Sequence, residues 1–268
     1  MFTPPSRAGF GVSGAHGSPL VAARDTLRLL LEAFEGGVRV FDTAPSYGAG
    51  EAERRLGAAI AALGRERVFI TTKAGLFSSG LSGRRRDFSP DAVEASVLAS
   101  LDRLGVAGVD MLFLHGAGVH ELTPALLDRL DALRRAGAFA RLGAAGRGAE
   151  LDAALADPRF DAIMAPVHPF LDEAETARLD RARLAGKAVF AIETAGDAPP
   201  GLRLPRRRSD LYGLARAARA RLGGAAGRGR IEVTEGFARA LRHDAVSCAL
   251  FTTTQRRHLA QCLAAFIP

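Results

Sequence analysis

Apolar and polar positions along the chain form a regular alternation of two patterns. Short and nearly continuous apolar runs, such as MLFLH, are typical of parallel strands that are buried on both faces. Longer stretches between them carry apolar residues at helical spacing. The apolar runs predict strands at residues 8–13, 38–44, 68–74, 109–115, 140–145, 160–166, 188–194 and 245–252.

Each predicted strand is followed by a predicted helix. The first helix is expected to have Ser18 as its N-cap and Pro19 at its first position, and to end at Gly36 and Gly37, because these residue types favour those positions. The remaining helices are predicted at residues 51–63, 90–105, 124–136, 149–156, 172–185, 210–222 and 235–242, with a last one ending near 266.

Eight strands that each precede a helix predict an α/β protein with a single (β/α)8 TIM barrel. A doubly wound open sheet normally has fewer strands and a topological switch point, so it is the less favoured fold. No linker or low-complexity stretch interrupts the pattern, and residues 1–268 are therefore expected to form one domain. The match of Gly9-Phe-Gly11-Val-Ser-Gly14 to a dinucleotide fingerprint is rejected, because the prolines before it are incompatible with a central strand.

Composition excludes several classes of protein. The chain has 48% hydrophobic and 24% charged residues, and its two cysteines form no CxxC motif, so a reducing cytoplasmic setting is expected. No signal peptide and no membrane span are predicted, since no apolar run reaches about 18 residues. The net charge of +7 reflects arginines spread along the chain, and two tyrosines without tryptophan do not favour nucleic-acid binding.

Polar side chains lie at or just beyond the carboxyl ends of three neighbouring predicted strands. Asp42, Lys73 and His115 each close an apolar run, and Tyr47 follows in the loop after Asp42. Active sites of barrels lie at this end of the strands. A lysine at the end of a buried strand needs a partner, and Asp42 is the expected one.

This set of residues indicates carbonyl reduction or the reverse oxidation. An ammonium beside a phenol favours the phenolate, so Tyr47 is expected to act as a proton donor to a developing alkoxide while a cofactor delivers hydride. His115 is expected to orient or polarise the carbonyl. Taken singly, each residue has an ordinary structural explanation, and the four together carry the hypothesis.

The segments FDTAPSYGAGEAERRLG, VFITTKAG, SLDRLGVAGVDMLFLHG and AVSCALFTTTQRRHLAQCLAAF together resemble the aldo-keto reductase family. The resemblance implies a TIM barrel that uses NADPH, less often NADH, without a metal. It implies that Tyr47 is the general acid and base, supported by Lys73, Asp42 and His115. The substrate would be a small carbonyl compound or alcohol.

The resemblance is weaker in the cofactor region. Ala145 and Met164 stand where the family has polar partners for the nicotinamide carboxamide, and no aromatic residue is available to stack on that ring. The resemblance and the position of the first loop nevertheless assign cofactor binding to Gly11, Val12, Ala145, Met164, Thr253, Thr254, Arg257, His258 and Gln261.

Three alternatives remain open at this point. In the first, the barrel uses its acid and base residues for a cofactor-free dehydration or isomerisation. In the second, it is a non-catalytic accessory subunit. In the third, His16, His115 and His168 join acidic residues in a metal site. The metal site is disfavoured because the first strand lacks a His-x-His pair. A monomer or weak dimer is expected.

The loops at the expected mouth of the barrel are also of interest. The runs Arg84-Arg85-Arg86 and Arg206-Arg207-Arg208 are expected to form a positive rim that attracts an anionic cofactor or substrate. Short loops and the absence of a long tail after the last helix predict an open substrate pocket. Candidates to line it are His16, Phe77, His120, His168 and Tyr212.

Overall fold

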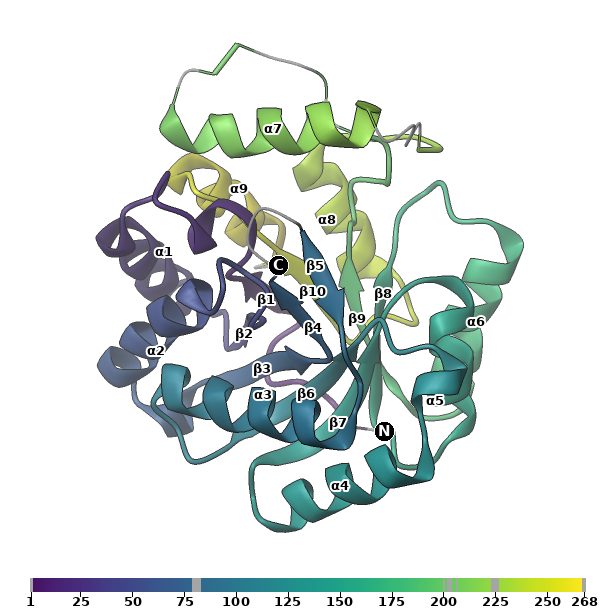
Figure 1. Cartoon of the computed structure of the whole chain (residues 1–268). Helices are drawn as coiled ribbons and strands as arrows, with labels where there is room; N and C mark the ends of the chain where they lie inside the picture. Colours follow the sequence, from purple (N-terminus) through teal and green to yellow (C-terminus); the bar gives the residue numbers. More distant parts are fainter. Residues whose placement is uncertain are drawn as a thin grey trace.

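The computed structural model describes residues 2–78, 83–199, 201, 204–205, 207–222 and 227–266. Among these residues, parallel strands close into a barrel in the order β1-β10-β9-β8-β7-β6-β3-β2, which confirms the predicted fold class (Figure 1). Strand β10 closes the barrel because it pairs with both β1 and β9. The barrel strands are β1 (Ala8–Gly11), β2 (Val40–Asp42), β3 (Phe69–Ala74), β6 (Val109–His115), β7 (Phe139–Ala145), β8 (Ala162–Pro166), β9 (Ala188–Ile192) and β10 (Cys248–Phe251).

Helices surround the barrel. They are α1 (Ala23–Glu35), α2 (Glu51–Leu63), α3 (Pro90–Leu104), α4 (Pro124–Arg135), α5 (Asp152–Ala156), α6 (Glu173–Leu184), α7 (Arg208–Leu222), α8 (Val233–Arg242) and α9 (Arg256–Phe266). Figure 1 shows α7 lying apart from this ring, beyond α8 and α9. None of the helices in the described part of the chain has the length and apolar character that a membrane span requires.

Two predictions about local structure were wrong. The helix expected to begin at Ser18 and Pro19 begins at Ala23, and a short 3-10 helix, η1 (Gly14–Gly17), precedes it. The Ser18 hydroxyl donates a hydrogen bond back to the carbonyl of Ala15, so it does not cap α1. Strands β4 (Leu76–Ser78) and β5 (Arg84–Arg86) form an antiparallel hairpin that was predicted as a loop.

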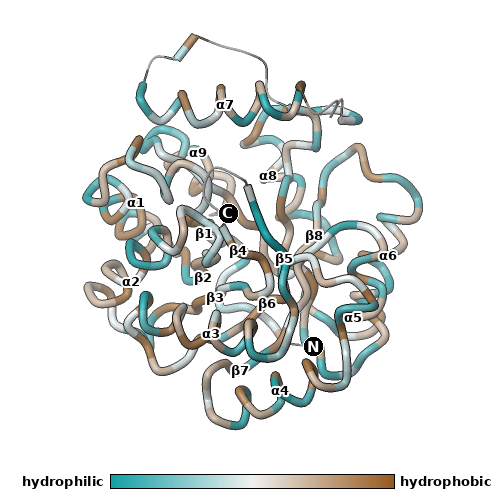
Figure 2. Tube along the Cα trace, in the orientation of Figure 1, coloured by the Kyte–Doolittle hydropathy of each residue, from teal (hydrophilic) through white to brown (hydrophobic). Residues whose placement is uncertain are grey.

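The core has two layers, one inside the barrel and one between the strands and the helices. The rings of Phe113 and Phe190 meet edge to face inside the barrel, with their centres 5.3 Å apart. Gly143 makes room for this pair, since a Cβ on it would lie 2.4 Å from the Phe113 ring. Brown colour along the strands and teal on many outer helix positions show the same division in Figure 2.

Candidate active site

The four residues predicted to carry chemistry lie at one end of three adjacent strands. Asp42 is the last residue of β2, Lys73 is next to last in β3, and His115 is the last residue of β6. Strand β3 pairs with both β2 and β6, in parallel. Tyr47 lies in the turn between β2 and α2. The structure therefore brings these side chains to the same mouth of the barrel.

Lys73 and Asp42 form a buried ion pair. The Lys73 Nζ lies 2.7 and 2.6 Å from the two carboxylate oxygens of Asp42, and 2.8 Å from the carbonyl oxygen of Thr43. Thr71 donates a further hydrogen bond to Asp42. Burial is the largest single effect and disfavours the ammonium, but the interactions with Asp42 and Tyr47 together outweigh it, so the pKa of Lys73 is raised. Lys73 therefore carries a positive charge inside the mouth.

Tyr47 and His115 are the other two residues of this group of four. The Nζ of Lys73 lies 5.2 Å from the centre of the Tyr47 ring, and Tyr47 is among the groups that raise the pKa of Lys73. The rings of Tyr47 and His115 meet edge to face, with centres 6.3 Å apart. Burial first, and then the charges of Lys73, Arg84 and Arg147, lower the pKa of His115 to about 3. The imidazole is therefore neutral near pH 7 and able to donate one hydrogen bond, and its buried Nδ1 has no partner among the described residues.

The loop that carries Tyr47 is held by a close backbone contact. A Cβ on Gly48 would lie 1.8 Å from the carbonyl oxygen of Gly17 in η1, and Gly48 has a φ of +64°. Both features require glycine at this position. The contact fixes the residue next to Tyr47 against the loop that follows β1.

His16 also anchors the loop that follows β1, through hydrogen bonds at both of its ring nitrogens. It therefore does not line the substrate pocket as expected. It is fully buried, with its Nδ1 3.0 Å from the Thr26 hydroxyl and its Nε2 2.9 Å from the carbonyl oxygen of Thr253. The carbonyl accepts only, so Nε2 carries the proton and Nδ1 accepts from Thr26. His16 thereby ties η1 to α1 and to the turn before α9.

We expect this buried histidine to make folding pH-dependent. Burial lowers the pKa of His16 to about 4, so between pH 6.5 and 4 the unfolded chain binds a proton that the folded chain does not. The free energy of unfolding should fall as the pH drops through this window, by up to about 3 kcal/mol for this group. Urea unfolding from pH 7 to 4 measures the slope.

The matched variants separate His16 from the other histidines. His16→Gln should reduce the dependence of the free energy of unfolding on pH. It should not abolish it, because the pKa of His115 is lowered in the same direction. His120→Gln, at an exposed position, should leave it unchanged. Equal slopes in wild type and His16→Gln would contradict the assignment.

The residues predicted to hold the nicotinamide either have apolar side chains or have backbone groups that are already hydrogen-bonded within the protein. Thr252 donates a hydrogen bond to the Gly11 carbonyl, and the amide of buried Val12 donates to the carbonyl of Asp42. Ala145 and Met164 are paired in register on β7 and β8 and pack inside the barrel. Neither offers a polar side chain, as the sequence indicated.

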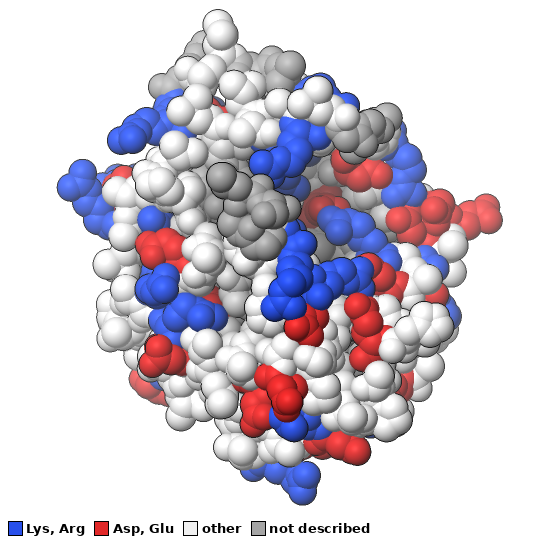
Figure 3. Space-filling view, in the orientation of Figure 1, with Lys and Arg blue, Asp and Glu red and all other residues white. Residues whose placement is uncertain are grey.

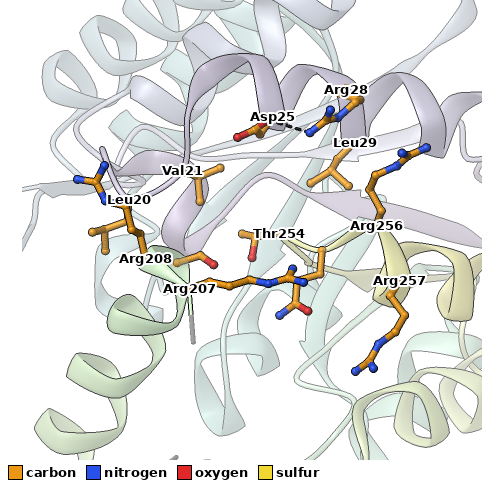
Figure 4. A pocket seen from close by; sticks show the side chains of 12 residues that line it. Leu20, Val21, Asp25, Arg28, Leu29, Arg207, Arg208, Thr254, Arg256 and Arg257 are labelled. Carbon is orange, nitrogen blue, oxygen red and sulfur yellow. Dashed lines mark hydrogen bonds and ion pairs between the residues drawn. The ribbon is translucent and has the colours of Figure 1, made fainter. Parts of the chain in front are cut away.

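The other predicted cofactor residues cluster at the start of α9. A pocket of about 400 Å³ there is lined by Thr254 and by Arg28, Arg207, Arg208, Arg256 and Arg257, with Asp25 the one acidic residue among its lining side chains (Figure 4). Thr253 is buried beneath it, and its hydroxyl accepts a hydrogen bond from the amide of Gln255. His258 and Gln261 lie on α9 outside the lining. Arg206 lies outside the described residues.

The arginines of this pocket differ in their partners. Arg28 is paired with Asp25 at 2.9 Å and Arg256 with Glu32 at 2.8 Å. In Figure 4, Arg207 extends across the pocket near Thr254, whereas Arg257 extends away from it. The guanidinium of Arg207 makes no hydrogen bond or ion pair with any residue that the structure describes, which leaves its charge available to an anion.

An ion pair that the sequence did not reveal lies at the mouth of the barrel, between the ends of β7 and β9. Arg147, just after β7, donates two hydrogen bonds to Glu193, just after β9. Glu193 has a φ of +53°, which is uncommon for a residue other than glycine. The two residues are 46 positions apart, and the pairing of β7 and β9 with the strand between them, β8, brings them together. Within the described ranges, no three His, Cys, Asp or Glu side chains are arranged to hold a metal ion.

Comparison with known proteins agrees with this architecture. The family model described as "Aldo/keto reductase family" matches residues 9–194. A D-threo-aldose 1-dehydrogenase from Pseudomonas sp. is 34% identical over 146 residues, which cover 47% of this chain and 44% of that protein. An NADH-specific methylglyoxal reductase from Escherichia coli is 30% identical over 161 residues, covering 54% of this chain and 49% of its own length. This chain thus spans less than half of the length of these curated relatives.

The structural likeness extends over more of the chain. An aldo-keto reductase from Bacillus halodurans, solved in its holo form, superposes with a TM-score of 0.75 and covers 100% of this chain and 90% of that one, at 21% identity. At this identity the superposition establishes the barrel fold. Because the family model matches more than half of the residues, the chain belongs to the aldo/keto reductase family.

Proposed function

We propose that this protein is an NAD(P)H-dependent oxidoreductase that reduces an aldehyde or ketone, or oxidises the corresponding alcohol. The observation that carries the proposal is the buried Lys73 ammonium, which is paired with Asp42 and lies 5.2 Å from the centre of the Tyr47 ring at the mouth of the barrel. The Tyr47 phenol, next to the neutral imidazole of His115, is suited to protonating a carbonyl oxygen.

Each side chain has a distinct part in the proposed reaction. Tyr47 donates its proton to the oxygen of the substrate as that oxygen gains negative charge, and the Lys73 ammonium stabilises the phenolate that remains. Asp42 balances the charge of Lys73 and holds its position. Neutral His115 donates a hydrogen bond to the same oxygen. A bound nicotinamide cofactor supplies the hydride, so that one hydride and one proton convert the carbonyl into an alcohol.

The pocket at the start of α9 supports binding of the adenosine phosphates. A helix N-terminus and several arginines attract phosphate, and the Arg207 guanidinium, which has no partner among the described residues, is suited to the additional 2′-phosphate of NADPH. We therefore propose a preference for NADPH over NADH. Thr253 and Thr254 would shape the turn that holds the phosphate.

A second candidate is favoured by the other end of the cofactor site. Ala145 and Met164 offer no polar side chain to a carboxamide, and the Arg147–Glu193 pair lies just beyond them. This arrangement favours a barrel that uses its acid and base residues without a nicotinamide, for a dehydration or an isomerisation, or one that serves as an accessory subunit.

Cofactor titration distinguishes the candidates. Titrating the protein with NADPH and NADH, followed by nucleotide fluorescence, should give saturable and tighter binding of NADPH, with a preference that declines as salt is raised. Arg207→Gln should weaken NADPH binding about 10- to 100-fold with little change for NADH. Arg219→Gln, on helix α7, which begins directly after Arg207, and outside the pocket, is the control. If neither nucleotide binds at millimolar concentration, the reductase is rejected and the second candidate stands.

A further inference from the structure

The hairpin of β4 and β5 presents two different faces. In its register Phe77 pairs with Arg85 and Ser78 with Arg84. Neighbouring side chains of a strand point to opposite faces, so Arg84 and Arg86 share one face and Arg85 lies on the other. Arg85 stacks over Phe77, with its guanidinium 5.0 Å from the ring centre, and pairs with Asp87 at 2.5 Å. The two faces of β5 therefore have separate surroundings.

The face that carries Arg84 and Arg86 is turned toward His115. Arg86 donates a hydrogen bond to the carbonyl of Gly116, the residue that follows His115. Arg84 is also one of three cations, with Lys73 and Arg147, whose charge acts on the His115 ring. Arg84 therefore lies on the face of β5 that is turned toward the loop after His115, at the mouth where a substrate carbonyl would meet His115 and Tyr47.

At this rim of the barrel mouth, the described arginines other than Arg84 are paired with acidic side chains. Arg86 pairs with Glu121 at 2.6 Å and with Glu150 at 3.6 Å, and Arg147 pairs with Glu193. The Arg84 guanidinium makes no hydrogen bond or ion pair with any residue in the described part of the chain. Figure 3 shows basic side chains gathered beside the hollow at the centre of this face, and Figure 2 shows β5 as strongly hydrophilic. Among the residues that the structure describes, Arg84 is therefore a positive charge at the mouth without a counter-charge.

We propose that Arg84 binds a carboxylate group of the substrate, so that the preferred substrates are carbonyl compounds that also carry one carboxylate. This inference rests on the proposed function. A guanidinium presents paired N–H donors that match the two oxygens of a carboxylate. One unpaired cation balances one negative charge, which fits a monoanion. Arg85, Arg86 and Arg147 are already occupied by acidic side chains of the protein.

Matched pairs of substrates test the inference. We would compare kcat/KM for 4-oxobutanoate with that for its methyl ester, and for glyoxylate with that for its methyl ester, since esterification removes the charge and keeps the carbonyl. Wild type should prefer both acids. The ratio of acid to ester should fall about 10- to 100-fold in Arg84→Gln. Arg84→Lys should recover part of it, and Arg85→Gln, on the opposite face of the same strand, should keep it.

The outcomes separate this inference from the proposed function. Reduction of acids and esters with the same ratio in wild type and Arg84→Gln would overturn the role of Arg84 and leave the reductase intact. If no carbonyl compound is reduced, calorimetric titration with 4-hydroxybutanoate still decides. Saturable binding that is lost in Arg84→Gln and kept in Arg85→Gln supports the carboxylate site, and absence of binding to wild type rejects it.

Discussion

Replacing Tyr47 with phenylalanine should lower kcat for carbonyl reduction by about 10²–10⁴-fold, the usual contribution of a general acid. The ring keeps its edge-to-face contact with His115, whose centre lies 6.3 Å away, and only the hydroxyl beside Lys73 is lost. The fold and the affinity for NADPH should therefore change little. Steady-state kinetics, circular dichroism and nucleotide titration on the same preparation measure the three quantities.

The chain offers a matched control for this substitution. Tyr212 is the other of its two tyrosines and lies on α7, where its ring packs near Gly14. Tyr212→Phe removes a hydroxyl in the same way, far along the chain from the Lys73 ammonium, and should retain activity. Full activity of Tyr47→Phe on a substrate that the wild type reduces would show that the phenol is not the acid.

Replacing Lys73 with methionine should destabilise the protein by about 3–5 kcal/mol, because it leaves the Asp42 carboxylate buried without its cation. Lys73 and Asp42 are 2% and 6% exposed, so solvent compensates little for the loss. The same substitution should abolish turnover, since the Tyr47 phenolate would lose its stabilising charge. Urea unfolding gives the stability and kinetics gives the activity.

The double variant Asp42→Leu with Lys73→Met separates these two effects. Removing both charges replaces the ion pair with apolar side chains, so most of the lost stability should return. Activity should not return. A stability of Lys73→Met equal to that of wild type would mean that Asp42 is not held as an ion in the folded protein.

The barrel was largely predictable because its strands and helices carry local signals. Residues 109–115 and 51–63 match β6 and α2, since a nearly continuous apolar run marks the strand and an amphipathic stretch before Gly64 marks the helix. The β4–β5 hairpin was missed because Arg84-Arg85-Arg86 has no apolar alternation, and its pairing depends on Phe77 and on the Gly116 carbonyl.

The candidate site was predictable to the extent that strand ends define it. Asp42, Lys73 and His115 could be placed together because adjacent parallel strands end at the same edge. The Arg147–Glu193 pair and the burial of His16 depend on contacts between residues far apart in sequence, and local patterns do not encode those. The same applies to the Arg84 guanidinium, whose lack of an acidic partner among the described residues depends on where the neighbouring acids lie in the fold.

The position of β10 between β1 and β9 means that the segment matched by the family model is not a self-sufficient folding unit. Residues 9–194 supply β1 to β9 but lack the strand that joins these two edges. A fragment ending there would expose unpaired N–H and C=O groups along both β1 and β9, which are templates for pairing with other chains. Such a fragment is expected to self-associate, so the last quarter of the chain protects the barrel from aggregation as well as contributing to the phosphate pocket.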